Sequence, residues 1–151
     1  MRKFVTLFTV LLVISCKSFA AGGDSSDSSD SSDEYIAKPW GYSKALKLIK
    51  KEKYQEAIQK LEKFLEKKKY TKDPDILNHY AFALRKVKKL LKAEEYYKKA
   101  LAIEPDHRGA LEYIGELYVD TNRLELARST LQKLEKCRCE EYAELKSYIN
   151  K

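Results

Sequence analysis

Glycine and proline are scarce in this sequence, with five glycines and three prolines among 151 residues. Charged side chains are abundant and make up 35% of the chain. This combination favours exposed helices over β-sheets. The length predicts one domain with one modest hydrophobic core.

Residues that enzymes commonly use for catalysis are also few. The only histidines are His79 and His107, and neither has an acid and a nucleophile beside it at helical spacing. The sequence contains no phosphate-binding loop, no HExxH pair and no nucleophile elbow. We therefore predict a non-enzymatic protein that needs no cofactor and no metal.

Long apolar runs are limited to residues 4–14 (FVTLFTVLLVI), which are too few to span a bilayer as a stable helix. Arg2 and Lys3 precede this run, and the small residues Ser18 and Ala20 follow it. This order of basic, apolar and small residues is typical of a signal peptide, here residues 1–20.

A second interpretation of the same segment remains open. The tetrapeptide VISC at residues 13–16 resembles a bacterial lipobox, which would make Cys16 the lipidated N-terminus. Both interpretations predict export from the cytoplasm. The periplasm is the expected location, and a membrane-anchored lipoprotein is the alternative.

Residues 21–37 have almost no apolar side chains and contain the triplet DSS three times. The acidic part, residues 24–34, carries a net charge of −5. Such a composition predicts a solvated, disordered tether. Its aspartates also suggest a calcium loop, but no helices flank them and no glutamate follows at the required distance.

A repeat of 34 residues organises the rest of the chain. A shift of 34 from the segment 74–107 places Ala93 on Ala127 and Ala81 on Gly115. A shift of 36 in the other direction places the same two alanines on Ala57 and Ala45, because Lys72 and Asp73 are inserted between the repeats. We expect three helical hairpins at 38–71, 74–107 and 108–141, and a capping helix at 140–150.

This 34-residue helix–turn–helix pattern resembles the tetratricopeptide repeat. The small residues Ala81 and Gly115 match the family's small position in the first helix, and Ala93 and Ala127 match that in the second. The segment ALAIEP at 100–105 is similar to the family's repeat ending. The resemblance implies an all-α array in which small residues let paired helices approach within about 8–10 Å.

The resemblance also implies that the first helices of the hairpins line a concave groove for a protein or peptide partner. The groove positions would be Tyr42, Leu46, Ile49, Lys50, Asn78, Phe82, Arg85, Lys86, Glu112, Glu116, Val119 and Asp120. These residues change from apolar to basic to acidic along the array. The alternative interpretation is a solvated helix face whose charges only keep the protein soluble.

The net charge of the repeats also falls along the array. It is +7 for residues 38–73, +2 for 74–107 and zero for 108–151. A basic first repeat could face anionic lipid, the acidic tether or an acidic partner. It could equally reflect a general lysine bias without any ligand. We do not expect nucleic acid as a partner, because the basic surface lacks arginines alternating with aromatic residues.

Three interpretations of Cys137 and Cys139 remain open. In the repeat register Cys137 takes the place of Ile103, where a core residue is expected, and Cys139 takes the place of Pro105. In an oxidising compartment the pair could form a structural disulfide, exchange thiols in a redox role, or bind a soft metal.

The sequence therefore favours a non-catalytic adaptor or scaffold that binds an unidentified protein or peptide in the bacterial envelope. The first alternative is a thiol-redox or soft-metal-handling protein that acts through the two cysteines. The second is a homo-oligomeric structural protein that assembles through the ends of the array.

Overall fold

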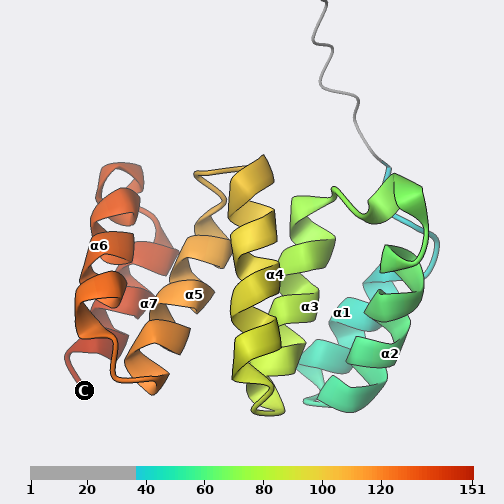
Figure 1. The fold of residues 1–151 in the computed structure, drawn as a ribbon, viewed down its shortest axis with the longest axis horizontal. Helices are drawn as coiled ribbons and strands as arrows, with labels where there is room; N and C mark the ends of the chain where they lie inside the picture. Colours follow the sequence, from blue (N-terminus) through green and yellow to red (C-terminus); the bar gives the residue numbers. More distant parts are fainter. Residues whose placement is uncertain (1–36) are drawn as a thin grey trace, which may run out of the picture. The chain divides into compact units, whose positions relative to one another are not determined.

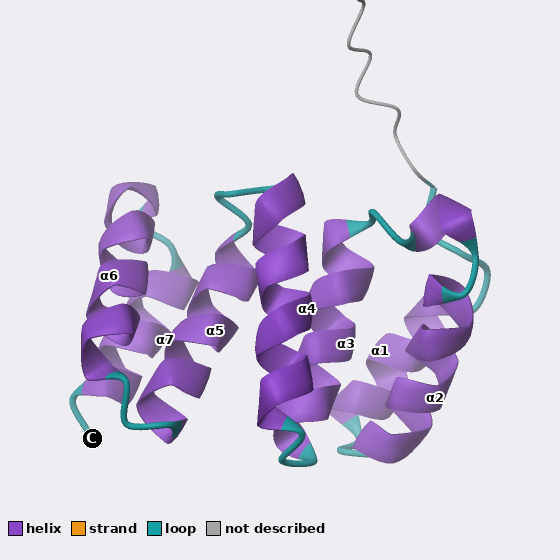
Figure 2. Cartoon of the chain, viewed as in Figure 1, coloured by secondary structure: helices purple, strands orange, loops and turns teal. Residues whose placement is uncertain are grey.

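The computed structural model describes residues 37–151, and every regular element in this part of the chain is helical (Figures 1 and 2). The all-α prediction is thus confirmed. The expected signal peptide, Cys16 and the tether up to residue 36 lie outside the described residues. None of the described helices is both long and apolar enough to cross a membrane.

Seven α-helices and two short 3₁₀ helices follow one another along residues 37–151. The α-helices are α1 (Tyr42–Lys50), α2 (Tyr54–Leu65), α3 (Pro74–Lys86), α4 (Leu90–Ile103), α5 (Arg108–Asp120), α6 (Leu124–Leu134) and α7 (Glu140–Ile149). The 3₁₀ helices are η1 (Lys68–Tyr70) and η2 (Glu135–Cys137). Helices α1 to α6 form three hairpins, α7 follows the last of them, and each helix packs on its neighbour in sequence (Figure 1).

Two of the hairpins begin with the same kind of cap. The Asp73 side chain accepts a hydrogen bond from the Ile76 backbone N–H (3.1 Å) and caps α3. The His107 ring accepts one from the Ala110 N–H (3.2 Å) and caps α5. These two residues are 34 positions apart, so the repeat extends to the caps, which satisfy backbone N–H groups that have no partner within the helix.

The turn within each hairpin has a left-handed residue at its centre. Glu52, Lys88 and Asn122 have φ values of 58°, 63° and 58°. In each turn the next N–H bonds to a carbonyl five residues back, as Lys89 does to Leu84 (2.9 Å). This is the Schellman ending of a helix, which usually has glycine at the left-handed position.

Alanines occupy the places where helices cross. The five alanines that define the repeat register have no exposed surface; they are Ala45, Ala57, Ala81, Ala93 and Ala127. Large side chains fill the remaining space around them, among them the fully buried Tyr80 and Tyr97. This alternation of small and large residues explains why the 34-residue spacing fixes the fold.

Helix α7 covers the last hairpin. Its Leu145 is fully buried and packs with Leu111 and Leu134. A Cβ atom added to Gly115 of α5 would lie 2.5 Å from Leu145 Cδ2, so this glycine provides the space for α7. The cap removes apolar surface that a terminal hairpin would otherwise leave in water.

Two residues lie where the sequence interpretation did not place them. Trp40 follows Pro39 just before the first helix, a position from which the sequence predicts that it covers the open end of the array, but it is 98% exposed. Ile103 was expected in the core, but it is 44% exposed because α4 ends there and turns towards α5.

Candidate functional site

The residues that the sequence assigned to a groove lie on the first helices of the hairpins, α1, α3 and α5. We call this surface the first-helix face. Tyr42, Asn78, Arg85 and Glu112 are buried in it. The half-buried members are Leu46, Ile49, Phe82, Glu116 and Val119, and the exposed members are Lys50, Lys86 and Asp120.

Arg85 at the centre of this face is engaged within the protein. Its guanidinium donates to the carboxylates of Glu116 and Asp120 on α5, the latter at 3.0 Å. Asp120 also accepts a hydrogen bond from the Tyr148 hydroxyl of α7 (2.7 Å). Arg85 is only 4% exposed, so it joins α3, α5 and α7 and does not offer a free cation to a partner.

Glu112 lies deep between α5 and α7 and is 3% exposed. Burial, together with hydrogen bonding to Glu144, raises the pKa of its carboxyl group to about 9. The carboxyl group is therefore protonated at neutral pH. The acidic end of the face consequently carries much less free charge than the sequence suggests, because Glu116 and Asp120 are paired with Arg85.

Aromatic side chains form a ledge in the middle of the face. The Phe82 ring lies 4.7 Å from that of Tyr113 and 6.2 Å from that of Tyr54, measured between centroids. The ammonium group of Lys86 lies 5.2 Å from the Phe82 centroid. We call Phe82 and Tyr113 the aromatic ledge, since both rings are half-buried and keep one part accessible.

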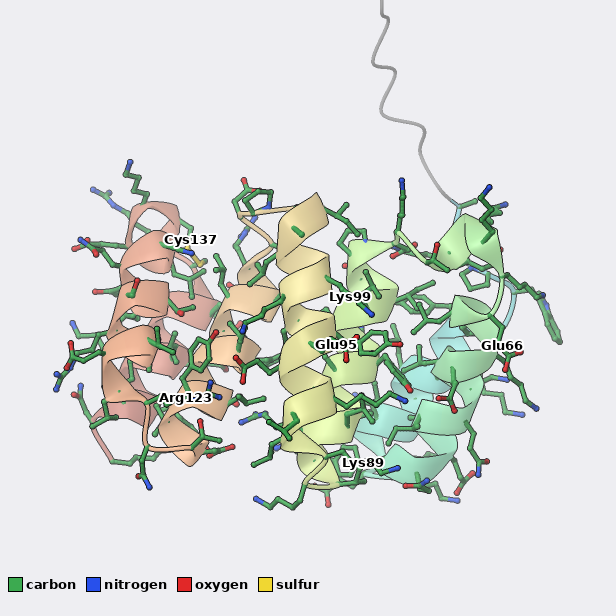
Figure 3. The ribbon with its side chains drawn as sticks, viewed as in Figure 1. Glu66, Lys89, Glu95, Lys99, Arg123 and Cys137 are labelled. Atoms are coloured by element: carbon green, nitrogen blue, oxygen red, sulfur yellow. A yellow bond between two sulfur atoms is a disulfide. The ribbon has the colours of Figure 1, made fainter. Side chains whose placement is uncertain are left out.

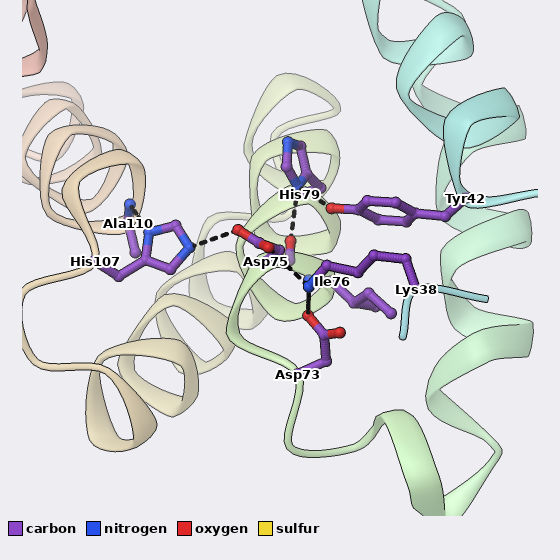
Figure 4. Close-up of polar contacts among 8 residues, drawn as sticks. All are labelled: Lys38, Tyr42, Asp73, Asp75, Ile76, His79, His107 and Ala110. Carbon is purple, nitrogen blue, oxygen red and sulfur yellow. Dashed lines mark hydrogen bonds and ion pairs between the residues drawn. The ribbon is translucent and has the colours of Figure 1, made fainter. Parts of the chain in front are cut away.

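A polar cluster joins the N-terminal ends of the first helices (Figure 4). Lys38 forms ion pairs with Asp73 (2.6 Å) and Asp75 (2.7 Å), and His107 Nε2 lies 3.1 Å from Asp75 Oδ1. The hydrogen bond to His107 and the ion pair with Lys38 hold the pKa of the Asp75 carboxyl below its usual range. The cluster thus links the start of the array to α3 and α5.

The second histidine belongs to the same region. His79 Nδ1 lies 2.8 Å from the Tyr42 hydroxyl oxygen and 2.7 Å from the Asp75 carbonyl oxygen. Burial lowers the pKa of His79 and raises that of the Tyr42 hydroxyl, so both groups favour their neutral forms. Both histidines therefore have a role in packing or capping, and within residues 37–151 no activated nucleophile lies beside either of them.

A shallow depression lies between α5 and α7. Its walls are Glu116, Glu140, Ala143, Glu144, Ser147, Tyr148 and Lys151. It continues the first-helix face onto the capping helix, because Tyr148 is bonded to Asp120 of that face.

The two cysteines lie at the junction of the last hairpin and its cap. Their sulfur atoms are at disulfide-bonding distance, with Arg138 in a left-handed conformation (φ 49°) between them. Cys137 was expected in a core position but is exposed, because η2 carries it out of the hairpin (Figure 3). Within residues 37–151 no set of three potential ligands forms a metal site.

Sequence reasoning missed several residues that shape this site. Lys38, Asp73 and Asp75 hold the N-terminal ends together, and Tyr148 holds the cap. Asp73 had a detectable signal, because an acid before Pro74 is typical of a helix start. The ion pairs of Lys38 had no detectable signal in the sequence, since its partners are more than 30 residues away.

Two comparisons with known proteins bear on this site. The family model for the tetratricopeptide repeat matches residues 84–147, from the end of α3 into α7. The matched part includes α5, the Arg85 ion pairs and the junction with the cap. No curated protein matches the chain.

Proposed function

Because this chain is a tetratricopeptide repeat protein, we propose that it is a non-catalytic module that binds a peptide or protein on its first-helix face. Repeats of this family generally mediate protein–protein interaction. The observation that carries the proposal is the aromatic ledge of Phe82 and Tyr113, which stays half-accessible at the centre of the face beside the exposed Lys86.

The side chains around the ledge define the chemistry of the partner. Leu46, Ile49 and Val119 are also half-buried, so apolar surface extends to either side of the ledge. The ammonium group of Lys86 lies next to the ledge, and Lys50 is exposed on α1 of the same face; no ion pair of either is found among the described residues. A segment with an apolar or aromatic anchor and a nearby carboxylate would fit this arrangement.

The scaffold beneath the ledge is fixed before any partner arrives. Arg85 connects α3 to α5, Tyr148 connects α5 to α7, and Tyr42 connects α1 to α3. A surface held in this way loses little conformational entropy on binding. We therefore expect binding with little backbone movement.

A peptide selection tests this function directly. A phage-displayed library of random peptides would be selected on the purified protein, and the enriched peptide would be titrated against variants. Phe82→Ala and Lys86→Glu should each weaken binding by about tenfold or more. Lys98→Glu, on the exposed side of α4, is the matched control and should bind normally; equal affinity of all variants, with unchanged melting curves, would refute the site.

The location of this activity is a separate part of the proposal. The N-terminal sequence leads us to place the protein in the bacterial envelope, where the partner would also be found. Intact-mass analysis of the protein from its natural host distinguishes a start at Ala21 from a lipidated Cys16. A chain that retains residues 1–20 without a lipid would contradict the envelope location.

A second candidate function rests on the sulfur pair. The Cys137 and Cys139 sulfur atoms lie at bonding distance and Cys137 is exposed, so an external thiol could reach the bridge. Thiol titration of native protein with and without prior reduction is the test. Two free thiols before reduction would exclude the bridge, and a reduction potential near −300 mV or below would favour a structural role over exchange.

A further inference from the structure

The turns within the three hairpins lie along one edge of the array (Figure 1). The first two of these turns are rich in lysine, and all of the lysines concerned are exposed: Lys50, Lys51, Lys53, Lys88 and Lys89. We call these five residues the lysine edge; Lys89 marks it in Figure 3. The third turn is different, because Arg123 is accompanied there by Asp120 and Glu125.

The charges of the lysine edge are mostly not neutralised within the protein. Among residues 37–151, Lys53 is the only member with an ion pair, to Glu56 at 2.8 Å. Glu52 is the one acid within the two turn segments, residues 50–53 and 88–89. Lys99 of α4, by contrast, is paired with Glu95 (2.6 Å), although other lysines of the described residues, such as Lys67 and Lys68, also have no ion pair there. The edge therefore presents a positive potential to the solvent.

The two lysine-bearing turns are neighbours in space. Tyr54, the first residue of α2, contacts Phe82 of α3 edge-on, with 6.2 Å between ring centroids. The ammonium group of Lys86, at the end of α3, lies over the same Phe82 ring. Lys53 precedes Tyr54 and Lys88 follows Lys86, so the lysines of both turns form one surface.

An exposed leucine projects from the same edge. Leu91 is 88% exposed and lies with Leu90 in a shallow depression whose other walls are Lys88, Lys89 and Lys92. Its neighbour Leu90 is half-buried, so the packing of α4 uses Leu90 and not Leu91. A large apolar side chain surrounded by lysines is typical of surfaces that meet a lipid headgroup layer.

We propose that the lysine edge and Leu91 dock the array on an anionic phospholipid surface. The ammonium groups would donate to lipid phosphates, and Leu91 would enter the boundary between headgroups and acyl chains. A membrane is favoured over an acidic protein because the lysines project along an edge and the depression beside Leu91 is shallow, so a flat surface reaches the lysines together. This inference goes beyond peptide binding.

Docking by this edge would leave the first-helix face accessible except at Lys50, the one residue that belongs to both surfaces. The helices run away from the edge, because every intrahairpin turn lies on it (Figure 2). Helices standing on the bilayer would present the sides of the array, including the aromatic ledge, to a partner in solution. Membrane docking and peptide binding could thus occur together.

Vesicle co-sedimentation of the full chain provides the test. Vesicles of phosphatidylcholine alone would be compared with vesicles containing phosphatidylglycerol, and the difference in bound protein is the signal. This difference removes any charge-independent binding through the apolar residues 4–14. It should be large at low salt and should fall as the salt concentration rises, because salt screens surface charges.

Charge and leucine variants assign the binding to this edge. Lys88→Glu/Lys89→Glu should reduce the phosphatidylglycerol-dependent partition by about 25-fold or more, and Leu91→Ala by about fivefold. The matched control, Lys67→Glu/Lys68→Glu, makes the same charge change around η1 and should behave like the unaltered protein.

Three results would overturn the proposal. The first is equal binding to both kinds of vesicle, or to neither. The second is a loss of binding as large in the η1 control as in the edge variant. The third is capture of an acidic protein through Lys88 and Lys89 without any phosphatidylglycerol-dependent binding, which would assign the edge to that partner. Circular dichroism checks that each variant remains helical.

Discussion

Leu145 of α7 occupies the space that a side chain on Gly115 of α5 would need. A Cβ atom at position 115 would lie 2.5 Å from Leu145 Cδ2 and 2.7 Å from Leu145 Cδ1. Such distances are far below ordinary carbon–carbon contact, so the buried Leu145 side chain or one of the two helices would have to move. The attachment of the cap therefore depends on the absence of a side chain at position 115.

We predict that Gly115→Ala destabilises the protein by about 1–3 kcal/mol, because it overpacks the junction with α7. Urea unfolding measures the change. In a Leu145→Ala background the same substitution should cost close to nothing, since its steric partner is gone. Gly109→Ala is the matched control: its Cβ would be 3.2 Å from Asn78 Nδ2, and its effect should be small. Equal costs of Gly115→Ala in both backgrounds would contradict the contact.

The left-handed turn residues predict substitutions that stabilise the protein. Lys88 has a φ of 63°, which costs a side-chain-bearing residue roughly 1 kcal/mol and costs glycine almost nothing. Lys88→Gly should therefore raise the free energy of unfolding by up to about 1 kcal/mol. Asn122→Gly should give a smaller gain, because asparagine tolerates this conformation. A loss of stability in Lys88→Gly would show that the turn is not left-handed.

Removal of the buried guanidinium should be costly. Arg85→Ala leaves Glu116 and Asp120 without their cation, and breaking a buried ion pair costs about 3–5 kcal/mol. Arg128→Ala serves as the control, because its pair with Glu125 is exposed and should contribute about 0–1 kcal/mol. Chemical denaturation of both variants makes the comparison. Similar losses in the two would mean that Arg85 is solvated in solution.

Glu112 should make the stability depend on pH. Its pKa is about 9 in the folded protein and close to 4.3 in an unfolded chain, so between these values the folded state holds a proton that the unfolded state lacks. The free energy of unfolding contributed by this group therefore falls as the pH rises from about 4.5 to about 9. Glu112→Gln should remove this slope, so its stabilising effect should grow with pH up to about 9.

Unfolding curves at several pH values measure the difference between Glu112→Gln and the unaltered protein. The groups that face Glu112 are Glu116 on its own helix and Glu141 and Glu144 on α7. The exposed Glu140→Gln controls for the loss of one negative charge. If both variants gave the same pH dependence, the carboxyl group of Glu112 would be ionised and solvated.

Much of the fold could be predicted from the sequence, because the helix crossings tolerate only small residues. Ala57, Ala93 and Ala127 recur at a nearly fixed spacing, and all three are fully buried. The spacing of 34 also relates His107 to Asp73, and both cap a first helix. Periodicity thus carries information about position within a hairpin.

The charge pairing and protonation of the site residues could not be predicted in the same way. The sequence places Arg85, Glu116 and Asp120 on one face, but it does not show that the three pair with one another and so cancel most of their charge. It also does not show that burial beside Glu144 keeps Glu112 protonated. Trp40 was misplaced because an apolar side chain next to an open end suggested a cover, whereas the chain directs it into solvent.

The central claim is that the first-helix face binds a protein partner, and site-specific photo-cross-linking in the natural host tests it most directly. A photoreactive amino acid would replace Lys86 beside the aromatic ledge or, as the control, the exposed Gln132 of α6. We predict a discrete adduct with one protein from position 86 and none from position 132. An adduct from position 132 alone, with both variants folded, would contradict the account.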